Sequence, residues 1–307
     1  VQAVLNQLDG KTADGCRRAP VPTILGMNFQ EVSVGQKLPV GGYVDAAGTP
    51  SPLLAGALEH VDASLGRMVA ALKARGLYDS TLIIVTAKHG QSPVDRAKLA
   101  MEAGGRGNAT VTDPLTFVNA ADPTVNNVLA SYVNPNDGSS PVVSGWLMAD
   151  DAGLLWLQNQ SASNLSNVVA QLTNPANAAA MFANVLPPGT ILDANINHGA
   201  QLSAIFGDPT SGDPVAAARA PNVFIQPNWG VIYSGSSKKI SEHGGGTLDD
   251  TGVALLISHP GLHAHTVAGH VWTKQVAPTI LRALDLDPEA LEAVRKEHTQ
   301  VLPGLPL

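Results

Sequence analysis

Two histidines that are each followed by glycine and fall on separate predicted sheet-edge loops are the residues of this 307-residue chain best suited to metal chemistry. His89 precedes Gly90, and His243 precedes the run Gly244–Gly246. Imidazole is a good zinc ligand, and glycine lets the backbone come close to a bound ion. Because most of the nine histidines will be structural or surface groups, the pattern defines a candidate ligand pair that the surrounding elements must bring together.

The stretch Leu82–Pro93 predicts how the first histidine is placed. Its apolar, β-branched run ends abruptly at Lys88. Such a run is typical of a strand buried on both faces, and in α/β sheets ligands bind beyond the carboxyl ends of the strands. Apolar residues at helical spacing over Ser51–Arg75, closed by Gly76, predict a long helix before this strand. With a further strand predicted at Val21–Met27, the unit is the strand–helix–strand crossover of a parallel sheet.

A polar stretch, Asn28–Lys37, follows the first predicted strand and contains several amide and hydroxyl side chains. Residues of these types form turns, and they also line pockets, so both interpretations are open. Asn28 and Gln36, together with Gln91 beyond the first histidine, are candidate substrate-binding residues. Lys88 is a candidate catalytic residue, because its positive charge could stabilise negative charge on a substrate.

The composition changes over residues 101–237, where Asn, Ser, Pro and Gly accumulate and apolar segments become shorter. We predict an inserted α+β subdomain here, between a first part of an α/β core at residues 1–100 and its final part at residues 238–307. Apolar segments on both sides of Asp150–Asp151 predict a β-hairpin. Three tryptophans of the insert are expected to be buried in a small second core, namely Trp146, Trp156 and Trp229.

The composition also excludes several classes of protein. The net charge of -7 and the lack of a strongly basic stretch argue against binding to a nucleic-acid duplex. No run approaches the roughly 18 apolar residues that a membrane span requires. The single cysteine, Cys16, excludes an intrachain disulfide and a Cys-rich metal site.

Three segments resemble the type I phosphodiesterases and nucleotide pyrophosphatases of the alkaline phosphatase superfamily. Gly76–Gly90 is similar to the family segment that ends in Ser-Asp-His-Gly. His243–Gly261 is similar to its second His-Gly loop and the strand that follows, and Thr273–Leu281 contains the Ala-Pro-Thr-Ile-Leu of its final helix. The resemblance implies an alkaline-phosphatase-like fold, in which helices sandwich a mostly parallel sheet.

The same resemblance implies a chemistry. In the family two divalent metals, usually zinc, flank a nucleophilic Thr or Ser that forms a covalent phospho-enzyme, because phosphoryl transfer needs positioning and neutralisation of oxygen charge. It gives metal-ligand roles to His89 and His243. It also implies a small phosphate ester or nucleotide as the substrate, and it favours a periplasmic or secreted location. The oligomeric state is not predicted.

The chain departs from the family pattern at three places. Lys88 replaces the family's metal-binding aspartate, and Val32 and Gln36 have the spacing of its Asp-x-x-x-His ligand pair. The strand and loop that carry the family's first aspartate and its nucleophile have no counterpart. We therefore expect the N-terminal part of the fold to be absent, with the nucleophile upstream of Val1. Lys88 is expected to supply the positive charge of a missing metal, as lysines do in the related sulfatases.

The leading hypothesis is a metal-dependent hydrolase of phosphate esters, phosphodiesters or nucleotide pyrophosphates, with one or two Zn²⁺ ions, of which this chain supplies the second half of the active site. One alternative is a sulfatase-like ester hydrolase with a single metal. Another is a noncatalytic relative or fragment that acts as a binding or structural module, which the missing ligands and nucleophile would also predict.

Overall fold

The computed structural model describes residues 1–121, 146–157, 159–183, 195–206 and 219–306. The chain divides into two compact units. Unit 1 consists of Val1–Phe29, Leu58–Lys88 and Val253–Leu307, and unit 2 consists of Gln30–Ala57 and His89–Gly252. The domain boundaries expected near residues 100 and 237 stay predictions.

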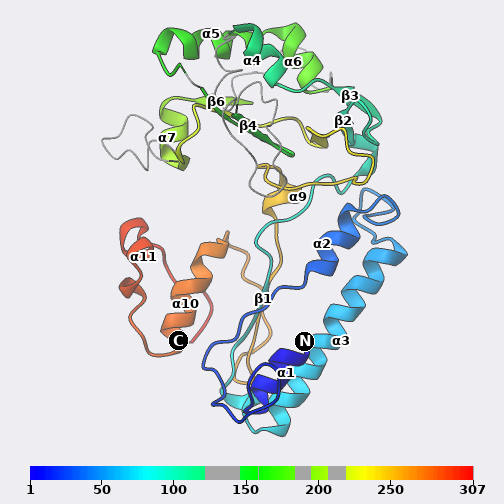
Figure 1. Cartoon of the computed structure of the whole chain (residues 1–307). Helices are drawn as coiled ribbons and strands as arrows, with labels where there is room; N and C mark the ends of the chain where they lie inside the picture. The colour runs from blue at the N-terminus through cyan, green and yellow to red at the C-terminus, as the bar shows by residue number, and fades with distance from the viewer. Residues whose placement is uncertain (122–145, 158, 184–194, 207–218, 307) are drawn as a thin grey trace. The chain divides into compact units, whose positions relative to one another are not determined.

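Unit 1 combines a two-stranded sheet with helices (Figure 1). Strands β1 (Ile83–Thr86) and β9 (Leu255–Ser258) pair antiparallel, with Ile83 opposite Ser258. The described helices and 3-10 turns of this unit are α1 (Gln2–Leu8), most of α3 (Pro52–Ala74), η1 (Tyr78–Ser80), η5 (Thr273–Gln275), α10 (Val276–Ala283), η6 (Pro288–Ala290) and α11 (Glu292–Glu297).

The long helix α3 begins and ends where the sequence predicts. The Ser51 hydroxyl accepts a hydrogen bond from the backbone N–H of Leu54 at 3.2 Å, which caps the first turn. At the other end Gly76 adopts a left-handed φ of +63°, and the Leu77 N–H reaches back to the Leu72 carbonyl. This is the usual glycine-terminated end of a helix, so the sequence prediction for this element is confirmed.

The predicted crossover around β1 is wrong in two respects. Residues Val21–Met27 form no strand, because Pro22 removes a backbone donor inside the segment. Among the described residues β1 pairs with β9, antiparallel, and not with a parallel neighbour. The sheet is also only partly buried: Thr86 is exposed, and 63% of Leu256 on β9 is exposed.

Unit 2 contains two sheets. The three-stranded sheet has the order β3-β2-β8 and is parallel, whereas the four-stranded sheet has the order β4-β5-β7-β6 and is antiparallel. Its strands are β2 (Ala100–Glu102), β3 (Ala109–Val111), β4 (Trp146–Ala149), β5 (Gly153–Trp156), β6 (Ile196–His198), β7 (Val223–Ile225) and β8 (Val231–Ile232). Ala149 pairs with Gly153, so the hairpin predicted across Asp150–Asp151 is confirmed.

Helices cover the antiparallel sheet and close the main core of unit 2 (Figure 1). Leu155 of β5 and Val223 of β7 are fully buried beneath Val168 and Leu172 of α5. Burial of such side chains supplies the main favourable free energy of folding. The described helices and 3-10 turns of this unit are α2 (Gln30–Lys37), η2 (Arg96–Lys98), α4 (Leu115–Ala121), α5 (Ala162–Leu172), α6 (Pro175–Met181), α7 (Ala200–Phe206) and α9 (Leu248–Thr251).

Helix α2 occupies the stretch that the sequence predicts as a turn or pocket lining. Glu31 lies in its first turn and Lys37 in its last, as the helix dipole favours. Gly35 is buried, and a Cβ on it would already touch the backbone of Leu54 at 3.5 Å. Close packing at this glycine holds the segment in place as a helix.

The described helices include none that is both long and apolar enough to cross a membrane.

Candidate active site

The two histidines singled out by the sequence lie side by side in unit 2. The ring centroids of His89 and His243 are 3.8 Å apart, and their planes are inclined by 28°. The first follows β1 in the chain and the second lies between β8 and α9. Folding thus brings together two side chains that are far apart in the sequence, and their role as metal ligands stays a prediction.

A hydrogen bond orients the first of these rings. Nδ1 of His89 lies 2.8 Å from the carbonyl oxygen of Gly90. Since a carbonyl oxygen only accepts, Nδ1 carries a proton, and in the neutral ring Nε2 then keeps its lone pair. Histidines that bind metals commonly have one nitrogen held in this way. The tautomer of His89 therefore suits metal binding through Nε2.

The two histidine loops are joined directly. Ser92 and Glu242 exchange two backbone hydrogen bonds of 2.7 and 2.9 Å, in an isolated antiparallel bridge. The N–H of Gly90 donates to the carbonyl of Asp250 at 2.6 Å. A Cβ on Gly90 would overlap the carbonyl oxygen of Asp249. A glycine is required here because the backbones of the two loops are in contact.

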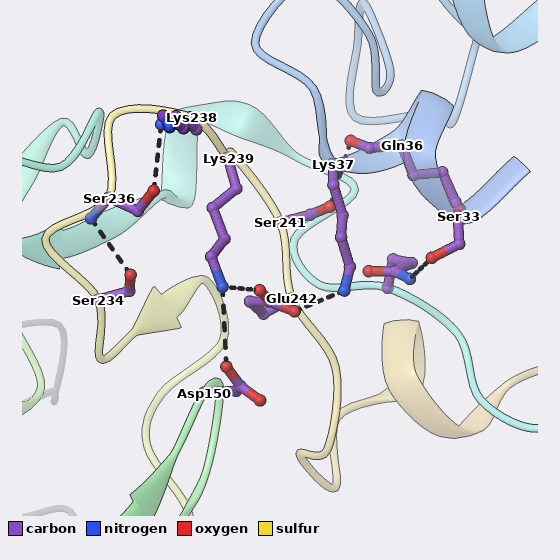
Figure 2. A network of polar contacts seen from close by, with 11 residues as sticks. Ser33, Gln36, Lys37, Asp150, Ser234, Ser236, Lys238, Lys239, Ser241 and Glu242 are labelled. Atoms are coloured by element: carbon purple, nitrogen blue, oxygen red, sulfur yellow. Dashed lines mark hydrogen bonds and ion pairs between the residues drawn. The ribbon is translucent and has the colours of Figure 1, made fainter. Parts of the chain in front are cut away.

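Glu242, which precedes the second histidine, is the centre of a buried polar network (Figure 2). Its carboxylate is 2.7 Å from the ammonium of Lys37 on α2, and it also pairs with Lys239. Lys239 is in turn 4.0 Å from Asp150. Burial alone would raise the pKa of Glu242, but the hydrogen bonds from the two lysines outweigh that effect and lower it. Glu242 is therefore held as a carboxylate.

The structure gives the predicted substrate-binding amides specific partners. The Gln36 side-chain nitrogen donates to the Tyr43 hydroxyl at 2.7 Å. Gln91 is 4% exposed and donates to the Ser33 hydroxyl at 2.9 Å, while its Oε1 is buried without a hydrogen-bond partner among the described residues. Asn28 and the exposed Lys88 belong to unit 1. The histidine pair and the polar network around Glu242 belong to unit 2.

A pair of buried carboxyl groups, Asp151 and Asp250, lies against the glycines that follow His243. The two residues are 2% and 3% exposed. A Cβ on Gly245 would lie 2.8 Å from Oδ2 of Asp250 and 3.0 Å from the carbonyl oxygen of Asp151. Thr247 donates to Asp250, but no described donor reaches either carboxyl oxygen of Asp151.

The acid pair cannot carry two negative charges at neutral pH. Burial and then the neighbouring Asp250 raise the pKa of Asp151 to about 9. Two buried carboxylates repel each other, and sharing a proton relieves the repulsion. The raised pKa of Asp151 therefore favours a proton on this pair, between the β4–β5 hairpin and the segment that carries the second histidine.

Trp229 departs from the prediction that the tryptophans of this region are buried. It is 39% exposed, and its indole N–H donates to Oδ2 of Asp249 at 2.6 Å. The ammonium of Lys98 lies 4.0 Å from its ring centroid, within cation–π range. Polar partners on both the ring and the N–H explain why it stays at the surface. Trp156 is half-buried, and the side chain of Trp146 lies outside the described residues.

The two histidines provide only part of the ligands that a zinc ion needs. A structural or catalytic zinc site takes four ligands, of which a catalytic site leaves one to water or substrate. The histidine pair would supply two of them. The described part of the chain contains no group of three or more His, Cys, Asp or Glu side chains that could hold a metal. The pair therefore fits part of a zinc site and does not complete one.

Comparison with known proteins identifies the family. The model of the type I phosphodiesterase / nucleotide pyrophosphatase family matches residues 42–245, about two thirds of the chain, and the match includes both histidines. The chain belongs to this family. No curated protein matches it.

Among solved structures, human ectonucleotide pyrophosphatase / phosphodiesterase 5 is similar, with 12% identity and a TM-score of 0.41 over 77% of this chain and 49% of that one. The chain thus spans about half the length of that protein.

The family predicted from the three resembling segments is confirmed, and with it the α/β class of the fold. The family is one of phosphodiester and pyrophosphate hydrolases by its description. The residues that sequence reasoning missed are Lys37, Glu242, Asp151 and Asp250. The only local signals were the two Asp-Asp dipeptides, Asp150–Asp151 and Asp249–Asp250. Neither dipeptide indicates that the other lies next to it in the fold.

Proposed function

We propose that this chain contributes to the active site of a divalent-metal-dependent hydrolase of phosphate esters or phosphodiesters, including nucleotide pyrophosphates. His89 and His243 are metal ligands, for one or two zinc ions. The observation that carries the proposal is the stacked pair of imidazoles, 3.8 Å apart, within the segment that matches the family model. A bound zinc ion would neutralise negative charge on the substrate's phosphate oxygens.

The protein's own residues would prepare this site. The Gly90 carbonyl holds the His89 ring in the tautomer that exposes Nε2, and the Ser92–Glu242 bridge fixes the distance between the two loops. Gln36 and Gln91, which belong to the same unit as the histidines, would contact the substrate. The roles expected of Lys88 and Asn28 stay predictions from the sequence. The nucleophile and the remaining metal ligands are not assigned among these residues.

The test is a zinc titration by isothermal calorimetry of the 307-residue chain and of His89→Ala and His243→Ala. The wild-type chain should bind zinc, and each variant should bind it at least about tenfold more weakly. His198→Ala, which removes an exposed histidine at the end of β6, is the matched control and should bind as wild type does. Equal zinc binding by all four proteins would contradict the ligand assignment.

A second candidate is a sulfatase-like ester hydrolase with a single metal. Lys88, at the position where the family resemblance implies a metal-binding aspartate, favours fewer metals than the family's usual two. Turnover of p-nitrophenyl sulfate, p-nitrophenyl phosphate and bis-p-nitrophenyl phosphate by zinc-loaded protein separates the two candidates. A chain that takes up no zinc and hydrolyses none of these esters would instead be a noncatalytic binding or structural module.

A further inference from the structure

Helix α2 contacts both histidine loops at points one to three residues from the histidines. On the first loop, Gln91 donates to the Ser33 hydroxyl at 2.9 Å. On the second, the Ser241 hydroxyl donates to the carbonyl of Gln36 at 3.2 Å, and the N–H of Ile240 donates to the carbonyl of Lys37 at 2.9 Å. One helix therefore holds both segments of the candidate site (Figure 2).

The strongest of these contacts is the ion pair between Lys37 and Glu242. The carboxylate side chain is 5% exposed and the lysine side chain is 26% exposed, with 2.7 Å between the charged atoms. Because the pair is largely withdrawn from water, it is screened less than a surface ion pair, and loss of one partner would leave a buried charge less well compensated.

The two lysines that neutralise Glu242 differ in what they connect. Lys239 is three residues away on the same segment, so its ion pair is local. Lys37 comes from α2, and its ion pair joins the helix to the residue directly before His243. Mutation of either lysine to methionine removes one positive charge beside Glu242, but only the Lys37 variant loses an ion pair to α2.

We infer that Lys37 is a positioning residue for the histidine pair: through Glu242 it fixes the His243 loop on the helix that also holds the His89 loop. The metal-binding consequence rests on the proposed function. The structural consequence, the 3.8 Å approach of the two rings, does not depend on it.

The first experiment compares zinc affinities of Lys37→Met, Lys37→Arg and the matched control Lys239→Met by calorimetry. Residues that orient metal ligands typically affect affinity by about 10- to 100-fold. Lys37→Met should weaken zinc binding by at least about tenfold, Lys239→Met by less than about threefold, and Lys37→Arg should restore most of the affinity. Equal losses in the two methionine variants, or wild-type affinity in Lys37→Met, would overturn the inference.

The second experiment uses metal-free protein, so that it remains decisive if no zinc binds. In perdeuterated protein with protonated histidine rings, nuclear Overhauser contacts between the rings of His89 and His243 should be present in wild type and in Lys239→Met. They should be lost or strongly weakened in Lys37→Met. Persistence of the contacts in that variant would refute the positioning role, whatever the outcome of the zinc titration.

A folding control accompanies both experiments. If Lys37→Met loses the cooperative thermal transition of the wild type, Ser241→Ala replaces it, because that change removes a side-chain contact between α2 and the same loop without leaving a buried charge. Ser241→Ala should then weaken the ring contacts in the same direction. Unchanged ring contacts in a folded Ser241→Ala would count against the inference.

Discussion

Replacing Asp151 by asparagine should change how the stability of the protein depends on pH. Burial, together with Asp250, raises the pKa of Asp151 to about 9 in the folded protein, whereas an aspartate in the unfolded chain titrates near about 3.9. Between these values the folded protein holds a proton that the unfolded chain has released. The free energy of unfolding therefore falls as the pH rises through this window, by up to about 1.4 kcal/mol per pH unit.

The slope sets the size of the expected effect. Between pH 5 and pH 8 the wild type would lose at most about 4 kcal/mol through this single group. The amide of an asparagine is uncharged throughout the range and can donate a hydrogen bond to the Asp250 carboxylate. Asp151→Asn should therefore be more stable than wild type at pH 8, and the difference should shrink towards pH 5.

Urea unfolding followed by circular dichroism at pH 5, 6, 7, 8 and 9 measures this difference directly. Asp62→Asn, which changes an exposed aspartate on α3, is the control and should follow the wild-type curve at every pH. If the difference between Asp151→Asn and wild type is the same at all five pH values, the carboxyl pair does not hold an extra proton, and the reasoning is refuted.

Two further substitutions test the contacts around the first histidine. Gly90→Ala should destabilise the protein by about 1–3 kcal/mol, because its Cβ would overlap the Asp249 carbonyl. The control is Gly56→Ala on α3, where the new methyl group meets only open space; it should stabilise the protein by about 0.5–1 kcal/mol. The midpoints of urea unfolding measure both effects. An unchanged midpoint in Gly90→Ala would mean that the Gly90 and Asp249 backbones are not in the close contact described above. Lys88→Asp should raise the zinc affinity if this lysine replaces the charge of a metal ion. An unchanged dissociation constant would argue against that role of Lys88.

Local patterns in the sequence were sufficient for several elements. The spacing of apolar residues and the terminal Gly76 specified α3, and the turn residues Asp150–Asp151 specified the β4–β5 hairpin. These features depend on periodicity and turn chemistry within about twenty residues, which the sequence displays directly. The three resembling segments likewise pointed to the family, whose model matches residues 42–245.

Patterns failed where packing decided the outcome. The apolar run before His89 predicted a doubly buried strand, but hydrophobicity does not specify which strand will be its neighbour, and β1 pairs antiparallel with β9. The polar composition of Asn28–Lys37 predicted a turn or a pocket lining. Instead Gln30–Lys37 forms helix α2, whose buried Gly35 packs against Leu54. Tertiary contacts overrode local preference at both places.

What the sequence determined by itself is the chemical inventory of the candidate site: two His-Gly loops, the first with a lysine directly before its histidine. The tertiary structure decided how that inventory is used. It stacked His89 on His243, and it placed Lys37 against Glu242 and Asp151 near Asp250. The physical reason is that such pairings depend on the path of the chain between distant residues, and no local pattern of residue types records that path.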